Sequence, residues 1–335
     1  MRRAERLRAQ QAKQSPRTLF ELDFLLMVDD ETRQGALRFK AEADGPFLHP
    51  AGQGRIPPLV ELPRLLSATD RFLAREDSAA DLALLLAPGS SLGGARPKAS
   101  VIDTDGQLAL AKFPARQDDL PVVEWESVAL RLAHEAGIAV PEWRRQEVAG
   151  KSVLLLRRFD RAPGIRIPYL SAMSMLGRRD NEPGNYLELA DAIQQFGACP
   201  EHDLRALWRR IVFNVLISNT DDHLRNHGFL YHGAAGWTLS PAFDLNPIPT
   251  DVKPRVLSTA IAHDDPTASV ELAMEVADYF RLSPRQARSI ARDVGQAVTG
   301  WRSAASACGL ARSDIQRMKS AFEHQDLRSV MQSRK

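Results

Sequence analysis

The sequence has 335 residues, which is enough for about two or three domains. Its 44 basic and 42 acidic residues give a net charge of only +2, which does not indicate a dedicated nucleic-acid-binding protein. Two cysteines are too few for a disulfide framework, and the sequence contains no run of about 18 apolar residues that could span a membrane. The basic start of the chain lacks the apolar core of a secretory signal. We therefore expect a cytoplasmic protein without a membrane span.

The first part of the chain predicts a mixture of strands and short helices. Residues 1–17 are polar and basic and predict a frayed helix or a flexible tail. Residues 19–39 contain strand-like pieces, whereas 59–73 and 78–87 have the apolar spacing of short helices. Residues 99–113 predict a hairpin, because a Thr-Asp-Gly turn separates two apolar runs.

The rest of the chain predicts mainly helices. The exceptions are a buried strand at 152–160 and a hairpin between 228 and 243. Helical spacing is found at 122–136, 186–197, 202–219, 269–280, 283–301 and 311–324. This order predicts an N-terminal α/β lobe over 18–160, which carries a Gly-rich loop and a hinge, and a helical C-lobe over 161–330.

The stretch from 219 to 227 has the highest density of reactive side chains. Asp221 and Asn226 have the Asp-x-x-x-x-Asn spacing of the protein-kinase catalytic loop, where Asp accepts the proton of the attacking hydroxyl and Asn binds Mg²⁺. Asp244, after the predicted hairpin, supplies a further carboxylate that could bridge metal and phosphates. In this interpretation Asp222 faces solvent.

The same stretch also permits a metal-site interpretation. His223 and His227 are four residues apart and lie beside two aspartates. They lie beyond the end of the predicted helix, however, and no Glu completes an H-E-x-x-H motif. We therefore expect His223 to support the loop and disfavour zinc.

Other parts of a phosphoryl-transfer site occur in order along the chain. A Gly-rich loop at 88–98 precedes Lys112 on a predicted strand, and Glu126 follows on a predicted helix, with Glu124 as a competitor. The loop is not a Walker A motif, because Lys98 follows Pro rather than Gly. Each feature alone has an ordinary explanation, namely an edge-strand charge, a solvated helix face or a surface turn. The ordered set favours phosphoryl transfer.

Four motifs resemble the HipA family of bacterial serine/threonine kinase toxins from type II toxin–antitoxin systems. They are Ser91-Leu-Gly-Gly-Ala-Arg-Pro-Lys98, Arg158-Phe-Asp-Arg161, Asn219-Thr-Asp-Asp-His-Leu-Arg-Asn226 and Ser240-Pro-Ala-Phe-Asp-Leu245. The resemblance covers about residues 20–325. It implies an α+β, two-lobed, protein-kinase-like fold with a mixed N-lobe and an all-helical C-lobe, and the use of ATP and Mg²⁺.

The resemblance implies a role for each matched residue. Asp221 would be the catalytic base, while Asn226 and Asp244 would bind Mg²⁺. The residues expected to contact or support the nucleotide are Gly93, Gly94, Ala95, Arg96 and Lys98 of the phosphate loop, Lys112, Glu126, the hinge residues Arg157 and Phe159, and His223. Family members often have Glu where Arg157 stands, a change that a backbone-mediated hinge contact would tolerate.

The resemblance also implies regulation and partners. Family members are inactivated by autophosphorylation of a serine at the start of the Gly-rich loop, which corresponds to Ser91, with Ser90 as a second candidate. Expected partners are a protein substrate such as an aminoacyl-tRNA synthetase and a HipB-type antitoxin, through which DNA would be bound indirectly. The usual small N-terminal β domain is shortened, which predicts a short, HipT-like form whose small domain acts as a separate antitoxin.

Two alternatives stay open at the level of sequence. A small-molecule phosphotransferase of the aminoglycoside-kinase type shares the Asp-x-x-x-x-Asn spacing but usually has His two residues before the Asp, where Asn219 stands here. A pseudokinase binding module is the other, and the presence of Lys112, Asp221, Asn226 and Asp244 together argues against it.

Overall fold

The computed structural model describes residues 2–48, 56–86, 90–91, 96–115, 118–180, 182–263 and 265–332. The chain divides into two compact units: unit 1 comprises Met1–Asp119 and Glu142–Arg166, and unit 2 comprises Leu120–Pro141 and Ile167–Lys335. This division differs from the expected lobes at two points. The boundary near residue 160 moves to 166, and helix α5 (Val122–Glu135) groups with unit 2.

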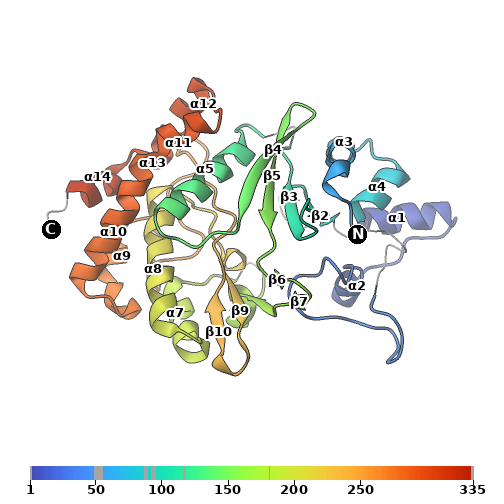
Figure 1. Ribbon diagram of the computed structural model, residues 1–335, viewed down its shortest axis with the longest axis horizontal. Helices are drawn as coiled ribbons and strands as arrows, with labels where there is room; N and C mark the ends of the chain where they lie inside the picture. Colours follow the sequence, from blue (N-terminus) through green and yellow to red (C-terminus); the bar gives the residue numbers. More distant parts are fainter. Residues whose placement is uncertain are drawn as a thin grey trace. The chain divides into compact units, whose positions relative to one another are not determined.

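The five-stranded antiparallel sheet of unit 1 has the order β1-β2-β3-β5-β4 (Figure 1). The predicted hairpin is confirmed: β2 and β3 pair in a register that places Lys98 opposite Lys112, and Gly106 in the turn has φ 79°. The predicted strand at 152–160 is confirmed as β5. The strands are β1 (Ser90–Ser91), β2 (Lys98–Ile102), β3 (Leu108–Lys112), β4 (Trp143–Val148) and β5 (Lys151–Arg157).

Two helices cover the core of this sheet. Leu62 and Leu65 of one helix, and Leu85 of the other, are buried against Val101, Ala111 and other sheet residues. Both helices were predicted from their apolar spacing. The helical segments of unit 1 are α1 (Arg2–Gln11), α2 (Glu21–Leu26), the 3₁₀ turn Leu59–Glu61, α3 (Leu62–Ala74) and α4 (Ala79–Leu86). Residues 2–11 of the expected tail therefore form α1.

The prediction of strands at 19–39 is wrong. Part of this segment forms helix α2, because the Asp23 carboxylate accepts the Phe20 N–H at 2.9 Å and so satisfies a donor at the helix start. The remainder is irregular, and beyond it Lys40 and Phe47 form an isolated bridge. Unit 1 ends with a short hairpin, β6 (Arg161–Ala162) and β7 (Ile165–Arg166).

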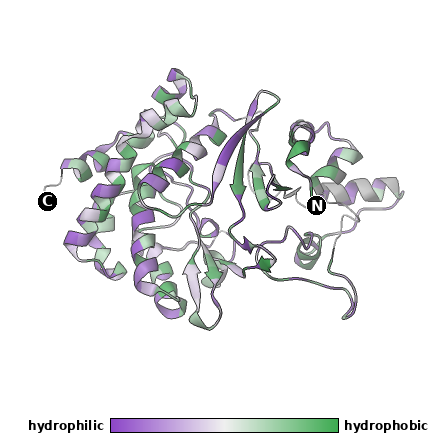
Figure 2. Cartoon of the chain, in the orientation of Figure 1, coloured by the Kyte–Doolittle hydropathy of each residue, from purple (hydrophilic) through white to green (hydrophobic). Residues whose placement is uncertain are grey.

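Unit 2 is mainly helical, as expected, and contains one small sheet of order β10-β9-β8 (Figure 1). Helix α8 packs on α7 and α10, and hydrophobic and hydrophilic residues alternate along these helices in Figure 2 as an amphipathic pattern requires. Its elements are α6 (Ala172–Met175), α7 (Tyr186–Phe196), α8 (Pro200–Leu216), β8 (Tyr169–Ser171), β9 (Gly228–Tyr231), β10 (Trp237–Leu239), α9 (Val270–Glu275), α10 (Pro284–Thr299), α11 (Trp301–Ala307), α12 (Arg312–Arg317), α13 (Lys319–Phe322) and α14 (Gln325–Gln332), with 3₁₀ turns Leu224–Asn226, Gly233–Ala235 and Ala277–Phe280.

Aromatic packing explains why α5 belongs to unit 2. Trp125 of α5 lies 6.3 Å from Trp301 and 6.1 Å from Phe322, between ring centroids, and the latter two rings stack at 4.6 Å. All three side chains are fully buried, so this cluster joins α5 to α11 and α13. Among the described residues, no helix is both long and apolar enough to cross a bilayer.

Candidate active site

The loop at 219–227 follows directly from the end of α8. The last two turns of this helix are buried, and Ser218 ends it with a φ of 52°, in the left-handed region. The Asn219 N–H then donates to the Asn214 carbonyl at 2.8 Å, which caps the helix. Because Ser218 is fully buried and donates its hydroxyl to Ala321 O at 2.8 Å, the loop leaves the helix from a fixed point.

Asp221 and Asn226 are brought together in this loop. The Asn226 side-chain amide donates to the Asp221 carbonyl oxygen at 3.2 Å, across the 3₁₀ turn Leu224–Asn226. The Asp221 carboxylate is 63% exposed, whereas Asn226 is buried. An accessible carboxylate can accept a proton from a hydroxyl, and an amide whose nitrogen donates a hydrogen bond keeps its oxygen available as an acceptor or ligand.

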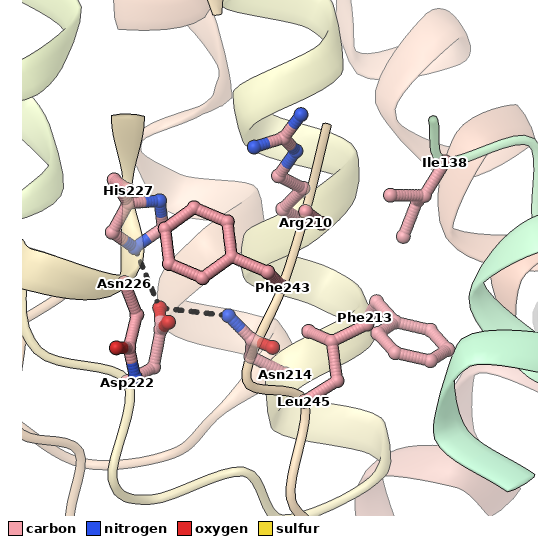
Figure 3. A pocket seen from close by; sticks show the side chains of 10 residues that line it. Ile138, Arg210, Phe213, Asn214, Asp222, Asn226, His227, Phe243 and Leu245 are labelled. Atoms are coloured by element: carbon pink, nitrogen blue, oxygen red, sulfur yellow. Dashed lines mark hydrogen bonds and ion pairs between the residues drawn. The ribbon is translucent and has the colours of Figure 1, made fainter. Parts of the chain in front are cut away.

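Asp244 lies in a strained turn that is linked to the same loop. Its φ of 55° is left-handed, a conformation that Asp tolerates better than most residues and that often marks functional positions. The Asn246 N–H donates to Asn219 Oδ1 at 3.3 Å. Phe243 and Leu245, which flank Asp244, line a cavity of about 10 Å³ together with Asn226 (Figure 3).

The expectation that Asp222 faces solvent is wrong. Its side chain is only 3% exposed and accepts hydrogen bonds from the Tyr186 hydroxyl, from Asn214 Nδ2 at 2.8 Å and from His227 Nε2 at 2.8 Å. Figure 3 shows the last two contacts. Because Tyr186 opens α7, Asn214 lies on α8 and His227 precedes β9, this one carboxylate connects three elements.

The electrostatics of this buried cluster keep Asp222 ionised. Burial alone would raise the pKa of Asp222, but the charge and hydrogen bond of His227 and the hydrogen bond of Tyr186 hold it below its ordinary value. Burial, followed by the Asp222 charge, raises the pKa of Tyr186 well above its ordinary value. Burial lowers the pKa of nearby Arg210 to about 10, so that side chain stays cationic.

His223 contributes two backbone hydrogen bonds to this loop. Its N–H donates to Asp221 O at 2.9 Å and its carbonyl accepts from the Asn226 N–H at 2.8 Å. Within the described ranges its ring Nδ1 has no hydrogen-bond partner, and no group of three or more His, Cys, Asp or Glu side chains is arranged to hold a metal ion.

Two charged residues that we expected to contact or support the nucleotide are buried. Lys112, at the end of the interior strand β3, is 8% exposed, and Glu126 on α5 is 4% exposed, whereas its competitor Glu124 is half-buried. The alternatives of an edge-strand charge and a solvated helix face therefore do not hold. Burying a charge is costly unless the site compensates it, so both positions are typical of functional or tightly paired groups.

The structure describes the two ends of the Gly-rich loop. Ser90 and Ser91 form β1 and pair with Ala99 and Lys98 of β2, respectively. Arg96 forms an ion pair with Asp118 at 2.7 Å. Gly93, Gly94 and Ala95 lie outside the described residues.

The segment expected to form the hinge, Arg157–Phe159, is tied into the sheet. The N–H of Arg157 donates to Glu142 O at 2.9 Å, and the next N–H, that of Arg158, donates to Leu108 O at 3.0 Å. The Arg157 guanidinium pairs with Glu142 and Asp105 on the surface. Phe159 follows and is half-buried.

Asp160, which we did not single out, is the buried centre of the Arg-Phe-Asp-Arg motif. Its carboxylate accepts from Arg158 at 2.6 and 2.7 Å, from Arg161 Nη1 at 2.9 Å and from the Gly35 N–H at 2.7 Å. Arg161 also donates to the Arg33 carbonyl at 2.6 Å. The motif therefore anchors the segment before residue 36 to the end of β5. The sequence signal that could have identified Asp160 as a buried, ion-paired residue is the presence of two arginines close to it in this motif.

The donor set in unit 2 fits Mg²⁺. This ion prefers oxygen ligands and is usually held by one or two carboxylates together with substrate phosphates, so a cage of protein side chains is not required. Asn226 offers an amide oxygen and Asp244 a carboxylate, on two segments that Asn219 links.

Sequence comparison identifies the family. The HipA-like C-terminal domain family matches residues 90–301, which is more than half of the chain. This chain belongs to the HipA-like family. It is 26% identical over 181 residues to the predicted kinase Y4mE of Sinorhizobium fredii, covering 46% of this chain and 41% of Y4mE. It is 27% identical over 184 residues to a predicted kinase of Haemophilus influenzae, covering 47% and 52%. The chain thus spans about half the length, or less, of these curated relatives.

Comparison of structures agrees with this assignment. HipA of Shewanella oneidensis MR-1, solved with HipB and its operator DNA, matches with a TM-score of 0.57 and 16% identity, over 73% of this chain and 64% of that chain. At this identity the likeness concerns the fold. The predicted α+β, kinase-like HipA fold is confirmed.

Proposed function

We propose that this protein is an ATP-dependent serine/threonine protein kinase that acts as the toxin of a toxin–antitoxin system. The observation that carries the proposal is the exposed carboxylate of Asp221 in a chain of the HipA-like family. The backbone carbonyl of Asp221 accepts a hydrogen bond from the Asn226 side chain, which links the two residues. The stretch containing Asp244 completes the set of oxygen donors.

Each residue has a defined role in the proposed reaction. Asp221 orients the acceptor hydroxyl and takes up its proton, while Asn226 and Asp244 hold Mg²⁺. The bound ion would neutralise charge on the phosphates. Lys112 would contact the α and β phosphates, Glu126 would support nucleotide binding, and the backbone of Arg157–Phe159 would hold the adenine. These assignments rest on the family motif and on the burial of both Lys112 and Glu126.

We further propose that the rest of the nucleotide site lies in the Gly-rich loop and at His223. Gly93, Gly94, Ala95, Arg96 and Lys98 would form the phosphate loop. Ser91, or its neighbour Ser90, would be the site of autophosphorylation. Both serines pair with β2 at the start of this loop, and a phosphate there would add a charge of nearly −2 next to the loop proposed to hold the ATP phosphates.

The proposed partners are a protein substrate, such as an aminoacyl-tRNA synthetase, and a HipB-type antitoxin. The antitoxin proposal rests on the likeness to Shewanella HipA, which was solved with HipB and operator DNA. DNA would then be bound through the antitoxin.

The proposal is tested by incubating the purified chain with γ-labelled ATP and Mg²⁺. We expect the label on the protein itself, at Ser91 or Ser90 by peptide mapping, and none with Asp221→Gln. Asp191→Asn removes an exposed carboxylate on α7 and is the matched control, which should keep full labelling. Equal labelling of the Asp221→Gln variant would refute the mechanism.

A further inference from the structure

A lysine far from Asp221 in sequence lies beside its carboxylate. Lys253 Nζ is 3.7 Å from Asp221 Oδ1 and donates a hydrogen bond to the Thr220 carbonyl oxygen at 3.2 Å. The lysine side chain is 37% exposed, so one side of the ammonium group faces the loop while the other is accessible. The bond to Thr220 fixes the ammonium group independently of the carboxylate.

The turn that carries Lys253 is itself held in place. The N–H groups of Val252 and Lys253 both donate to the Pro249 carbonyl, at 3.0 and 3.2 Å. The Thr250 N–H donates to Ser320 Oγ at 3.0 Å, which ties the turn to α13. The cation is therefore presented by an ordered turn, as preorganised electrostatic stabilisation requires.

The following segment holds both neighbours of Asp221. Thr220 O accepts from the Ser258 N–H at 3.1 Å and from its hydroxyl at 2.9 Å, and the Thr259 hydroxyl donates to Asp222 O at 2.7 Å. Ser258 and Thr259 thus fix the residues on either side of Asp221, and they lie five and six residues after Lys253 in the chain.

Other basic residues of the loop are less suited to a charge-neutralising role. Arg225 is ion-paired with Asp180 on the surface, and His223 contributes its backbone to the 3₁₀ turn. Among the ion pairs of the described residues, the partner of Asp221 is Lys253. An exposed pair of this kind contributes little to folding stability, so stability does not account for its placement.

We propose that Lys253 is a further residue of the phosphoryl-transfer site, positioning Asp221 and neutralising charge on the transferred phosphoryl group. This inference rests on the proposed function. In the reaction, the acceptor oxygen bonds to the γ phosphorus as the bond to the β,γ-bridging oxygen breaks, the hydroxyl proton passes to Asp221, and ADP leaves. Negative charge on the phosphoryl oxygens must be stabilised during transfer, and a fixed cation beside the base provides this.

The test compares Lys253→Met with Lys319→Met. Lys319 is a suitable control because it is also exposed and lies 3.8 Å from a carboxylate, that of Glu323. With γ-labelled ATP and Mg²⁺, we expect Lys253→Met to lower the maximal rate of autophosphorylation by about 100-fold or more, while the ATP concentration at half-maximal rate and the melting temperature stay near wild type. Lys319→Met should behave as wild type, and Lys253→Arg should restore part of the rate.

A second readout needs no turnover. Aluminium fluoride with ADP and Mg²⁺ imitates the transferring phosphoryl group, so it should tighten nucleotide binding to the wild type and much less to Lys253→Met, whereas binding of a non-hydrolysable ATP analogue should be equal. Lys253→Gln, which can still donate to Thr220 O, should also lose the tightening, and it replaces Lys253→Met in every assay if that variant does not fold.

Three results would overturn the inference. In the first, Lys253→Met has the wild-type rate and the wild-type response to aluminium fluoride, which refutes the role of Lys253 and leaves the kinase proposal intact. In the second, Lys253→Met and Lys253→Gln both lower the rate together with the melting temperature and the affinity for the non-hydrolysable ATP analogue, which indicates a structural role only. In the third, wild-type protein transfers no phosphate, which refutes the proposed function and the inference with it.

Discussion

Asp160 and Asp222 are both buried aspartates in motif segments, but their surroundings differ. Asp160 in unit 1 is compensated by two guanidinium groups and one backbone N–H. Asp222 in unit 2 is compensated by a phenol, an amide and an imidazole. The first arrangement anchors a chain segment with charge. The second joins three secondary-structure elements and adjoins, along the chain, the residue that carries the exposed Asp221 carboxylate. These two buried acids therefore differ in purpose: Asp160 anchors a chain segment, and Asp222 holds the loop that carries Asp221.

The largest effect on stability is expected from Asp160→Ala. This change leaves Arg158 and Arg161 without their buried carboxylate, and breaking a buried ion pair in this way costs about 3–5 kcal/mol. The free energy of unfolding of unit 1 should fall by that amount in urea titrations followed by circular dichroism. A loss below about 1 kcal/mol would mean that the arginines find other partners, and the contrast with Asp222 would disappear.

Asp222→Asn should affect activity as well as stability. The amide keeps the shape of the side chain but removes the charge that three donors face, so we expect about 1–3 kcal/mol of lost stability. Misalignment of the loop should also reduce phosphate transfer at least about tenfold at temperatures where the variant is folded, which corresponds to about 1.4 kcal/mol in the barrier. Unchanged transfer by a variant of lowered stability would reduce Asp222 to a purely structural residue.

Acid should reduce the stability that the buried carboxylates of Asp160 and Asp222 contribute. The ion pairs of Asp160 and the hydrogen bonds of Asp222 hold each pKa below its ordinary value despite burial. A lowered folded-state pKa contributes stability above the unfolded value of about 3.9, and this contribution is lost as pH falls from there through the folded pKa. The stability difference between wild type and Asp222→Asn should therefore be constant from pH 7 to about 5 and shrink below about 4. A difference that grew on acidification would contradict an ionised Asp222.

The smallest effect is expected at Asp103, which pairs with Arg144 at the protein surface. The Arg144 guanidinium lowers the pKa of Asp103 to about 2, with contacts of 2.6 Å, but the arginine is largely exposed. Asp103→Asn should cost about 1 kcal/mol or less in the free energy of unfolding. A larger loss would show that the surface pair is as important as the buried one at Asp160.

The sequence indicated the spacing of the site but not which side chains are buried. Asp221 with Asn226, and Asp222 with His227, have the same separation of five residues, so the two pairs interleave in one loop. Only the first pair matches a known motif, so the sequence offers no role for Asp222 and we expected that side chain to face solvent. The direction of Asp222 depends on Tyr186 and Asn214, which are distant in sequence, and periodicity carries no information about such contacts.

Elements with strong local signals were predicted well. The Thr-Asp-Gly hairpin and helix α8 follow from turn chemistry and apolar spacing. Helix α2 was missed because its short apolar run also fits a strand, and the Asp23 cap decides between the two. The grouping of α5 with unit 2 depends on Trp125 contacting Trp301, across more than half the chain.

Phosphoproteomics after induction tests the central claim most directly, by comparing cells that express wild type with cells that express Asp221→Gln at equal levels. The kinase account predicts serine or threonine phosphopeptides from at least one other cellular protein, and from Ser91 or Ser90 of this chain, only with wild type. Identical phosphoproteomes in the two strains, with both proteins folded, would contradict the assignment of this chain as a protein kinase.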